Sequence, residues 1–178
     1  IVMFRQPANR EEHFAILVGE INAETPPLVR LHSQCVTGDI LGSLKCDCGP
    51  QLQAALVQMQ EAGGGILLYL AQEGRDIGLL NKIRAYALQD AGLDTVDANH
   101  RLGFETDERV FSPAAAMLKA LDASKIKLIT NNPDKLNQLS KHGITIIQRI
   151  GLSLPTNPHN HSYLETKKAR IGHFIDPQ

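Results

Sequence analysis

The sequence predicts an α/β protein with three layers, in which a mostly parallel or mixed sheet lies between two layers of helices (α/β/α). Strand-like and helix-like segments alternate between residues 65 and 148, which is typical of a sheet with helices on its faces. The run Ile66–Leu70 is apolar throughout, as expected for a strand buried on both faces. No internal repeat or low-complexity segment interrupts the 178 residues, so we expect a single domain over residues 1–178.

Short apolar runs give the remaining expected strands. In residues 28–33 apolar and polar residues alternate, so Arg30 and His32 are expected on one face of a strand. Further strands are expected over residues 14–21, 125–130 and 144–148.

Proline, glycine and capping residues delimit the expected helices. Pro50 suits the first residue of a helix that ends at Gly63, because its missing N–H has no intrahelical partner there. Ser112 is expected to cap a helix that runs to about residue 122, and Asn132 a helix that ends at Gly143. Helices are also expected over residues 79–90 and 162–174, and a long polar connection of functional importance over residues 93–111.

Composition argues against several classes of protein. The formal net charge of −1 is unlike the basic excess of a nucleic-acid-binding protein. No run reaches the ~18 apolar residues of a membrane span, and no signal peptide is visible, so we expect a cytoplasmic protein with reduced thiols. The chain begins at Ile1 without an initiator Met, which leaves open a missing N-terminal segment or an upstream fused domain.

The cysteines are the strongest chemical signal. All three lie between residues 35 and 48, at Cys35, Cys46 and Cys48, and an odd number cannot pair fully as disulfides. Thiolates bind Zn²⁺ well, and three protein ligands leave a fourth position open, as in catalytic zinc sites. The spacing is not that of a standard zinc finger, and cysteine also serves as a small buried hydrophobe. The spacing alone leaves both interpretations open.

Four cations lie in expected loops or at strand ends, where they suit phosphate groups: Arg30, Arg75, Arg109 and Lys135. Thr130–Pro133 precedes an expected helix N-terminus, whose free N–H groups attract anions. The alternatives are solvated surface charges and simple helix capping.

Three further residues carry possible chemistry. Asp107 could accept a proton, or it could only form a local salt bridge with Arg109. Tyr86 lies on a helix with an apolar face, where a core role competes with a catalytic one. His32 could donate to a phosphate or satisfy the edge of a strand.

Several segments together resemble the GTP cyclohydrolase II family of riboflavin biosynthesis. They are residues 28–52, which hold the three cysteines, residues 63–104, the Asp-Glu-Arg run at 107–109, and residues 128–136. These motifs occur in the family's order, and the resemblance extends from about residue 14 to 173. It implies one catalytic domain.

The resemblance also implies roles for individual residues. Cys35, Cys46 and Cys48 would hold the catalytic Zn²⁺, Asp107 would accept a proton, and Tyr86 matches a helix tyrosine of the family. The family proposal for Arg109 is a nucleophile at the α-phosphorus, but an arginine is almost never deprotonated, so transition-state charge stabilisation is its more ordinary role. Glu73 would read guanine by accepting hydrogen bonds from its ring N–H and amino groups. The implied GTP-binding residues are Arg30, Leu31, His32, Ser33, Gln34, Gln51, Glu73, Gly74, Arg75, Thr95, Thr130 and Lys135.

The implied reaction is hydrolysis of GTP to 2,5-diamino-6-ribosylamino-4(3H)-pyrimidinone 5′-phosphate, formate and pyrophosphate. The zinc centre would direct water to C8 of guanine, and Mg²⁺ would accompany the triphosphate. The resemblance implies a homodimer. The net charge and the lack of a long apolar run argue against nucleic-acid and membrane partners. The alternatives are a GTP-binding regulatory protein without turnover, a homologue that opens the ring without releasing pyrophosphate, and a purely structural zinc module.

Three positions depart from the family pattern. Gln34 stands where many members carry an acid, Ala71 where an arginine is common, and Val110 where an aspartate is frequent. The loss of a carboxylate and an arginine could change substrate affinity or pH dependence, whereas the metal ligands and the Asp107–Arg109 pair are retained.

Overall fold

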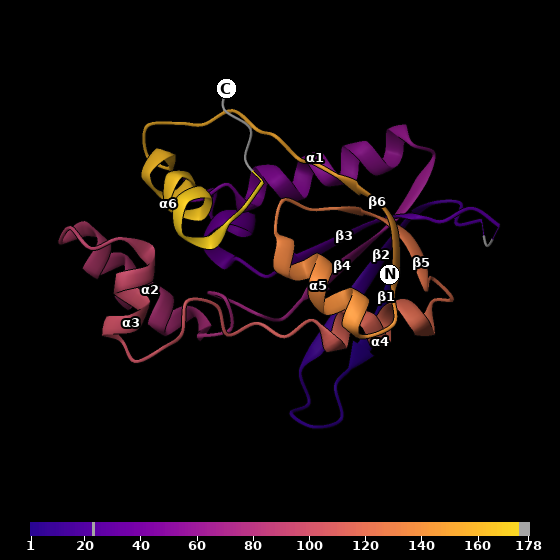
Figure 1. The fold of residues 1–178 in the computed structure, drawn as a ribbon, viewed down its shortest axis with the longest axis horizontal. Helices are drawn as coiled ribbons and strands as arrows, with labels where there is room; N and C mark the ends of the chain where they lie inside the picture. Colours follow the sequence, from indigo (N-terminus) through magenta and orange to yellow (C-terminus); the bar gives the residue numbers. More distant parts are fainter. Residues whose placement is uncertain (23, 175–178) are drawn as a thin grey trace. The chain divides into compact units, whose positions relative to one another are not determined.

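The computed structural model describes residues 1–22 and 24–174, and its α/β architecture confirms the predicted fold class (Figure 1). The described residues form two compact units. The first comprises Ile1–His32, Gln51–Ala71 and Val110–Leu152, and the second comprises Ser33–Pro50, Gln72–Arg109 and the chain from Ser153 onward. The single-domain organisation stays a prediction.

The first unit contains a mixed sheet of six strands in the order β1-β2-β4-β3-β5-β6. β1 pairs with β2, and β2 with β4, in antiparallel fashion, whereas β3 pairs with β5, and β5 with β6, in parallel. The parallel half follows from the strand–helix alternation of the sequence. The strand bounds are Val2–Arg5, Glu12–Gly19, Leu28–Ser33, Gly64–Leu70, Lys125–Ile129 and Thr145–Ile150 for β1 to β6.

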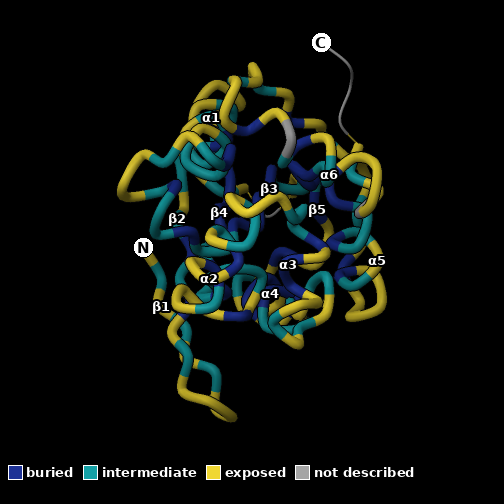
Figure 2. Tube along the Cα trace, turned by 90° about the vertical axis from the view of Figure 1, so that its left-hand side faces the viewer, coloured by how far each residue is buried: buried dark blue, intermediate teal, exposed yellow. Residues whose placement is uncertain are grey.

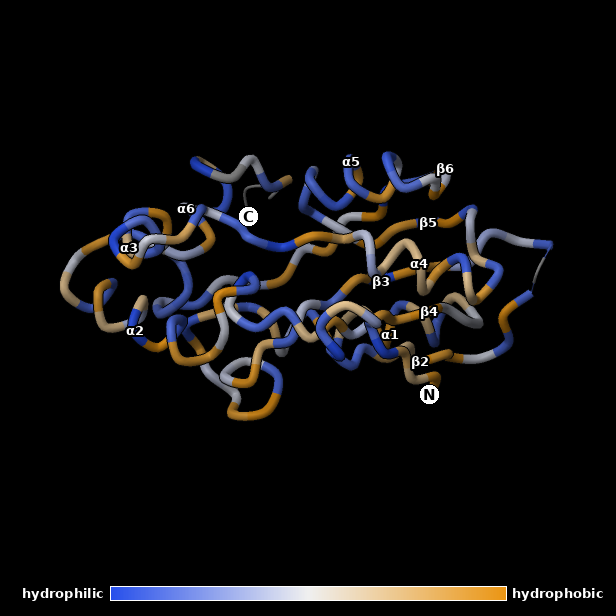
Figure 3. The backbone as a smooth tube through the Cα atoms, turned by 90° about the horizontal axis from the view of Figure 1, so that it is seen from below, coloured by the Kyte–Doolittle hydropathy of each residue, from blue (hydrophilic) through white to orange (hydrophobic). Residues whose placement is uncertain are grey.

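Helices cover both faces of this sheet. Phe111 and Leu118 at α4 (Ser112–Ala120), with Leu139 of α5 (Pro133–Lys141), pack in one buried cluster with inner-strand residues. Met59 of α1 (Cys48–Glu61) belongs to a second buried cluster that also contains strand residues. The central strands β3, β4 and β5 are therefore the most buried part of the sheet, whereas β1 and β6 are partly exposed (Figures 2 and 3).

The second unit contains a short π-helical turn, η1 (Val36–Ile40), and the helices α2 (Gly78–Asp90), α3 (Thr95–Arg101) and α6 (His161–Ile171). α3 packs against both α2 and α6. α2 follows a loop in which Arg75 and Asp76 adopt positive φ angles of 60° and 75°. None of the helices in the described ranges is long and apolar enough to cross a membrane.

Several local predictions need correction. The strand β1 was not expected, and α3 occupies part of the expected connection over residues 93–111, because Asp94 caps it by accepting from the N–H groups of Val96 and Asp97. Ser112 is the first residue of α4 rather than its cap. α1 begins at Cys48, so Pro50 is an interior residue of its first turn, where a missing N–H still has no intrahelical partner. Asn132 caps α5 as expected.

Candidate functional site

The three cysteine sulfurs converge in the second unit. Cys35 precedes η1, Cys46 follows the loop after it, and Cys48 is the first residue of α1. Their ligand atoms all lie within 4.8 Å of one another, and the Sγ atoms of Cys35 and Cys46 are 3.8 Å apart. Two thiolates that bind one tetrahedral Zn²⁺ at ~2.3 Å lie roughly 3.8 Å apart, so the geometry fits a metal centre. Among the described residues, Cys35, Cys46 and Cys48 are the group of His, Cys, Asp or Glu side chains whose ligand atoms lie close enough together to hold a metal ion.

Two glycines allow the cysteine loop to close around the sulfurs. A Cβ atom at Gly38 would lie 2.8 Å from Cys46 Sγ and 3.1 Å from Cys35 Sγ, and one at Gly49 would lie 2.4 Å from the carbonyl oxygen of Gly38. The Gly38 N–H also donates to Cys35 Sγ at 3.3 Å, which stabilises a thiolate. The sequence therefore places glycine where a side chain would displace the sulfurs.

The three thiols differ in acidity because they share hydrogen bonds. Hydrogen bonds from Cys46 and Cys48, with a further one from Lys82, hold the pKa of Cys35 well below its usual range. The same bonds to Cys35 raise the pKa of Cys46 and of Cys48, and burial adds to the rise. Metal binding here would release protons, because cysteine binds a metal as the thiolate.

Lys82 and Glu73 lie directly beside Cys35. The Lys82 Nζ is 3.0 Å from Cys35 Sγ and 2.8 Å from Glu73 Oε1. Glu73 Oε2 accepts a hydrogen bond from the Val36 N–H at 2.6 Å. Glu73 is among the predicted residues, whereas Lys82 is not, because its only signal in the sequence is its position four residues before Tyr86 on one helix face.

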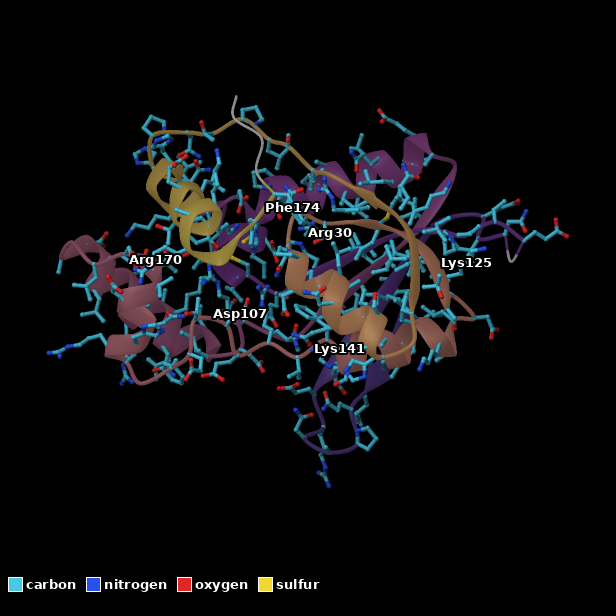
Figure 4. All side chains as sticks on the ribbon, viewed as in Figure 1. Arg30, Asp107, Lys125, Lys141, Arg170 and Phe174 are labelled. Atoms are coloured by element: carbon cyan, nitrogen blue, oxygen red, sulfur yellow. The ribbon has the colours of Figure 1, made fainter. Side chains whose placement is uncertain are left out.

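Asp107 and Arg109 form a two-bond ion pair in the same unit (Asp107 is labelled in Figure 4). Arg109 Nε donates to Asp107 Oδ1 at 2.8 Å and Nη2 donates to Oδ2 at 2.5 Å, while Nη1 donates to Ser33 Oγ at 3.3 Å. Burial opposes ionisation of Asp107, but the hydrogen bonds and charge of Arg109 outweigh it and lower the pKa of this carboxyl. Burial likewise opposes the charge of Arg109, but its bonds to Asp107 leave its pKa raised. Both groups are therefore charged at neutral pH.

The loop before α2 is tied to the segment that carries Asp107. Arg75 Nη1 donates to the carbonyl oxygen of Thr106 at 3.1 Å, and the Glu108 N–H donates to the carbonyl oxygen of Arg75 at 3.3 Å. Gly74 has a φ of +64°, and a Cβ there would lie 3.0 Å from the Cβ of Lys82. The second unit thus brings together Arg75, Gly74, Glu73 and the Asp107–Arg109 pair.

Tyr86 lies between two cations. Lys45 Nζ is 5.1 Å and Lys82 Nζ 5.7 Å from the centroid of its ring. Burial raises the pKa of the Tyr86 phenol, which therefore keeps its proton at neutral pH. The remaining predicted residues of this unit are Ser33, Gln34 and Thr95, all of intermediate burial, with Thr95 at the start of α3.

α6 contacts the cysteine loop through a buried ion pair that the sequence did not reveal. Lys167 Nζ is 2.8 Å from Oδ1 of Asp47, the residue between Cys46 and Cys48, and both side chains are 10% exposed. The ammonium also lies 4.4 Å from the ring centroid of Tyr163. At the C-terminal end of the same helix, Arg170 pairs with Asp94 and Asp97 of the α3 N-terminus (Arg170 is labelled in Figure 4).

The first unit holds a second group of predicted residues, at the carboxyl ends of β3 and β5. Arg30 Nη2 donates to Gln51 Oε1 at 2.6 Å, and Lys135 Nζ donates to the carbonyl oxygen of Leu31 at 2.7 Å (Arg30 is labelled in Figure 4). Thr130 Oγ1 accepts from the Asn132 N–H at 3.0 Å. His32 stacks with Tyr69, its ring centroid 5.5 Å away. Because β3 and β5 are parallel, these residues end up at one edge of the sheet.

The chain is similar to one family of enzymes along nearly all of its length. The family model described as GTP cyclohydrolase II matches residues 1–151. A protein of Enterobacter sp. named GTP cyclohydrolase-2 is 54% identical over 175 residues, which cover 98% of this chain and 89% of that protein. Proteins of the same name from Hamiltonella defensa and Citrobacter koseri are 53% and 54% identical over 175 residues, with the same coverage.

Proposed function

Because the chain belongs to the GTP cyclohydrolase II family, we propose that it is the enzyme that hydrolyses GTP in riboflavin biosynthesis. The products are 2,5-diamino-6-ribosylamino-4(3H)-pyrimidinone 5′-phosphate, formate and pyrophosphate. The observation that carries this proposal is the convergence of three cysteine sulfurs within 4.8 Å in a chain that matches the family over residues 1–151.

Cys35, Cys46 and Cys48 are the proposed ligands of one Zn²⁺ per subunit. Support comes from the 3.8 Å separation of the Cys35 and Cys46 sulfurs and from the glycine at position 38, where a Cβ would lie 2.8 Å from Cys46 Sγ. Zinc held by three thiolates supplies a Lewis acid that makes water nucleophilic near neutral pH.

Asp107, Arg109 and Tyr86 are the proposed catalytic residues. Asp107 is ionised and able to accept a proton, and its pairing with Arg109 sets its orientation. Arg109 remains protonated, which supports stabilisation of negative charge at the α-phosphorus rather than nucleophilic attack. Tyr86 retains its proton because burial raises its pKa, so it can donate a hydrogen bond to the reacting group.

The nucleotide-binding residues are proposed for each unit separately. In the first unit the cations Arg30 and Lys135 suit phosphate oxygens. In the second unit Arg75 suits phosphate oxygens. The Glu73 carboxylate accepts hydrogen bonds from the N–H groups of Val36 and Gly74 and from the Lys82 ammonium. Its remaining lone pairs can accept hydrogen bonds from the guanine edge. Mg²⁺ would accompany the triphosphate, since it favours substrate phosphates. The other proposed contacts are Leu31, His32, Ser33, Gln34, Gln51, Gly74, Thr95 and Thr130.

The enzyme is further proposed to be a cytoplasmic homodimer. Exposed apolar side chains on the cysteine loop and on α2 support dimerisation, because a partner subunit would remove them from water. Leu41 is 72% exposed and Leu80 is 65% exposed. Lys45 holds this loop beside α2, since it pairs with Asp90 and lies over the ring of Tyr86.

The test is product analysis on zinc-loaded protein. The protein is incubated with GTP and Mg²⁺, and formate, pyrophosphate and the ultraviolet band of the diaminopyrimidine are followed together. Equimolar formate and pyrophosphate are expected. Tight GTP binding without product would identify a regulatory protein, and formate without pyrophosphate would identify an enzyme that keeps the triphosphate.

A further inference from the structure

Lys82 is a buried cation in direct contact with a sulfur of the metal centre. Its side chain is 10% exposed, and that of its partner Glu73 is 9% exposed. Its Nζ lies 3.0 Å from Cys35 Sγ and 2.8 Å from Glu73 Oε1, so one ammonium bridges a thiolate and a carboxylate. A lysine is seldom buried unless such partners hold it, so its place is defined by these two contacts.

The charges around the sulfurs explain what this ammonium does. Three thiolates carry three negative charges, which exceed the two positive charges of a divalent metal ion. Glu73 adds another negative charge within reach of the same site, because its Oε2 accepts from the N–H of Val36, the residue after Cys35. Lys82 supplies positive charge between the two, and a hydrogen bond to a ligand sulfur withdraws electron density from it.

We propose that Lys82 is a positioning residue of the metal centre: its ammonium orients the Cys35 thiolate and limits the electron density that this sulfur donates to the metal. This inference rests on the proposed zinc centre and adds a residue to it. A simpler role, in which Lys82 only neutralises buried Glu73, makes a different prediction, because it leaves the electronic state of the sulfur unaffected.

Cobalt substitution separates the two roles without any turnover. Co²⁺ replaces Zn²⁺ in the purified protein, and the sulfur-to-cobalt charge-transfer band is recorded without GTP. Lys82→Met is expected to move the band to longer wavelength, because a sulfur that has lost its hydrogen bond gives up electrons more easily. The Cys35 thiolate also loses the contact that orients it, so zinc binding should weaken by roughly 10–100-fold, measured by competition with a chromogenic chelator. Lys82→Arg, which keeps the charge, should recover most of that affinity.

Two matched variants complete the experiment. Glu73→Gln removes the carboxylate charge but keeps the contact between Lys82 and sulfur, so the cobalt band should stay near its wild-type position. Arg84→Met removes an exposed cation of the same helix, whose side chain donates to Asn81, and should change neither readout. Wild-type cobalt spectrum and zinc affinity in folded Lys82→Met would overturn the proposal.

Folding is checked by circular dichroism before either readout. If Lys82→Met does not fold, Lys82→Gln carries the test: its uncharged amide should still shift the band to longer wavelength, and an unshifted band would refute the role. Absence of GTP turnover in zinc-loaded wild-type protein would refute the proposed function instead, and it would leave the cobalt result standing. In active protein, Lys82→Met should lower kcat more than it changes KM.

Discussion

The sulfur of Cys35 contacts several other groups of the second unit. Its sulfur accepts from the Gly38 N–H and from Lys82 Nζ, and it lies 3.8 Å from the sulfur of Cys46. Hydrogen bonds to Cys35 and Cys46, together with burial, raise the pKa of Cys48 well above its ordinary value.

Replacement of one sulfur should separate a catalytic from a structural metal centre. Cys48→Ser is expected to abolish zinc retention and turnover while the fold remains, because a serine hydroxyl does not ionise to replace a thiolate. Zinc per chain and far-ultraviolet circular dichroism are the measurements. Wild-type protein stripped by a chelator is the matched control and should behave the same way; unfolding of both samples would identify a structural zinc module.

The Asp107–Arg109 pair should make stability depend on pH. The folded pKa of Asp107 is below its ordinary value of ~3.9, so its contribution is complete above about pH 4 and is lost as the pH falls through the folded pKa. Asp107→Asn should lower the free energy of unfolding by about 3 kcal/mol at pH 7 and by much less in strong acid. Urea unfolding at a series of pH values tests this. Glu105→Gln, at an exposed position of the same segment, should have little effect at any pH.

At the scale of elements, α6 forms ion pairs with two other segments of the second unit, one pair buried and one at the surface. Lys167 and Asp47 form a buried pair, whereas Arg170 and its partners lie at the surface, where ion pairs contribute little. The buried pair is therefore expected to be the stronger of these two ion-pair contacts of α6.

Loss of the ion pair between Lys167 and Asp47 should make α6 less stable and should speed the release of bound zinc. Lys167→Met leaves Asp47 without this ammonium, and loss of one partner of a buried pair destabilises by about 3–5 kcal/mol. Faster amide hydrogen exchange in α6 and faster zinc loss to a chelator are expected. Lys168→Met, one residue further along and exposed, is the control. Equal exchange rates in the two variants would contradict this attachment of α6.

For the whole molecule, the sequence was sufficient where local pattern determines structure. Residues 28–33 form β3 as expected, and the apolar run within β4 is buried as expected. Asn132 caps α5, because its side chain accepts from the Asp134 N–H. The cysteine cluster was predicted from residue chemistry. The match of residues 1–151 to the GTP cyclohydrolase II family confirms the predicted family.

The rest depended on contacts between distant residues. β1 was missed because its pairing with β2 is an antiparallel register that a four-residue run does not reveal. Lys82 and Lys167 were missed because lysine normally marks a surface, and only their partners in space justify burial. Asp94 was missed as a cap because residues 93–111 lack the apolar periodicity that usually indicates a helix.

The oligomeric state is the remaining property of the whole molecule to test. Leu41→Glu is expected to shift a dimer toward monomer, because it replaces an apolar side chain that is 72% exposed with a charged one. Sedimentation velocity at micromolar concentration measures the shift. Val57→Glu alters a residue that is 55% exposed on α1 and should leave the dimer intact. Wild-type protein that sediments as a monomer would refute the homodimer.

The ion pair between Asp47 and Lys167 can form only late in the synthesis of the chain. Its partners are separated by 120 residues in the chain. A ribosome that adds roughly 5–20 residues per second makes Lys167 on the order of ten seconds after Asp47. All three thiols are synthesised before α6, so the proposed metal site could take up zinc before the helix forms. Pulse-labelled nascent chains arrested before α6 should therefore take up zinc and release it quickly.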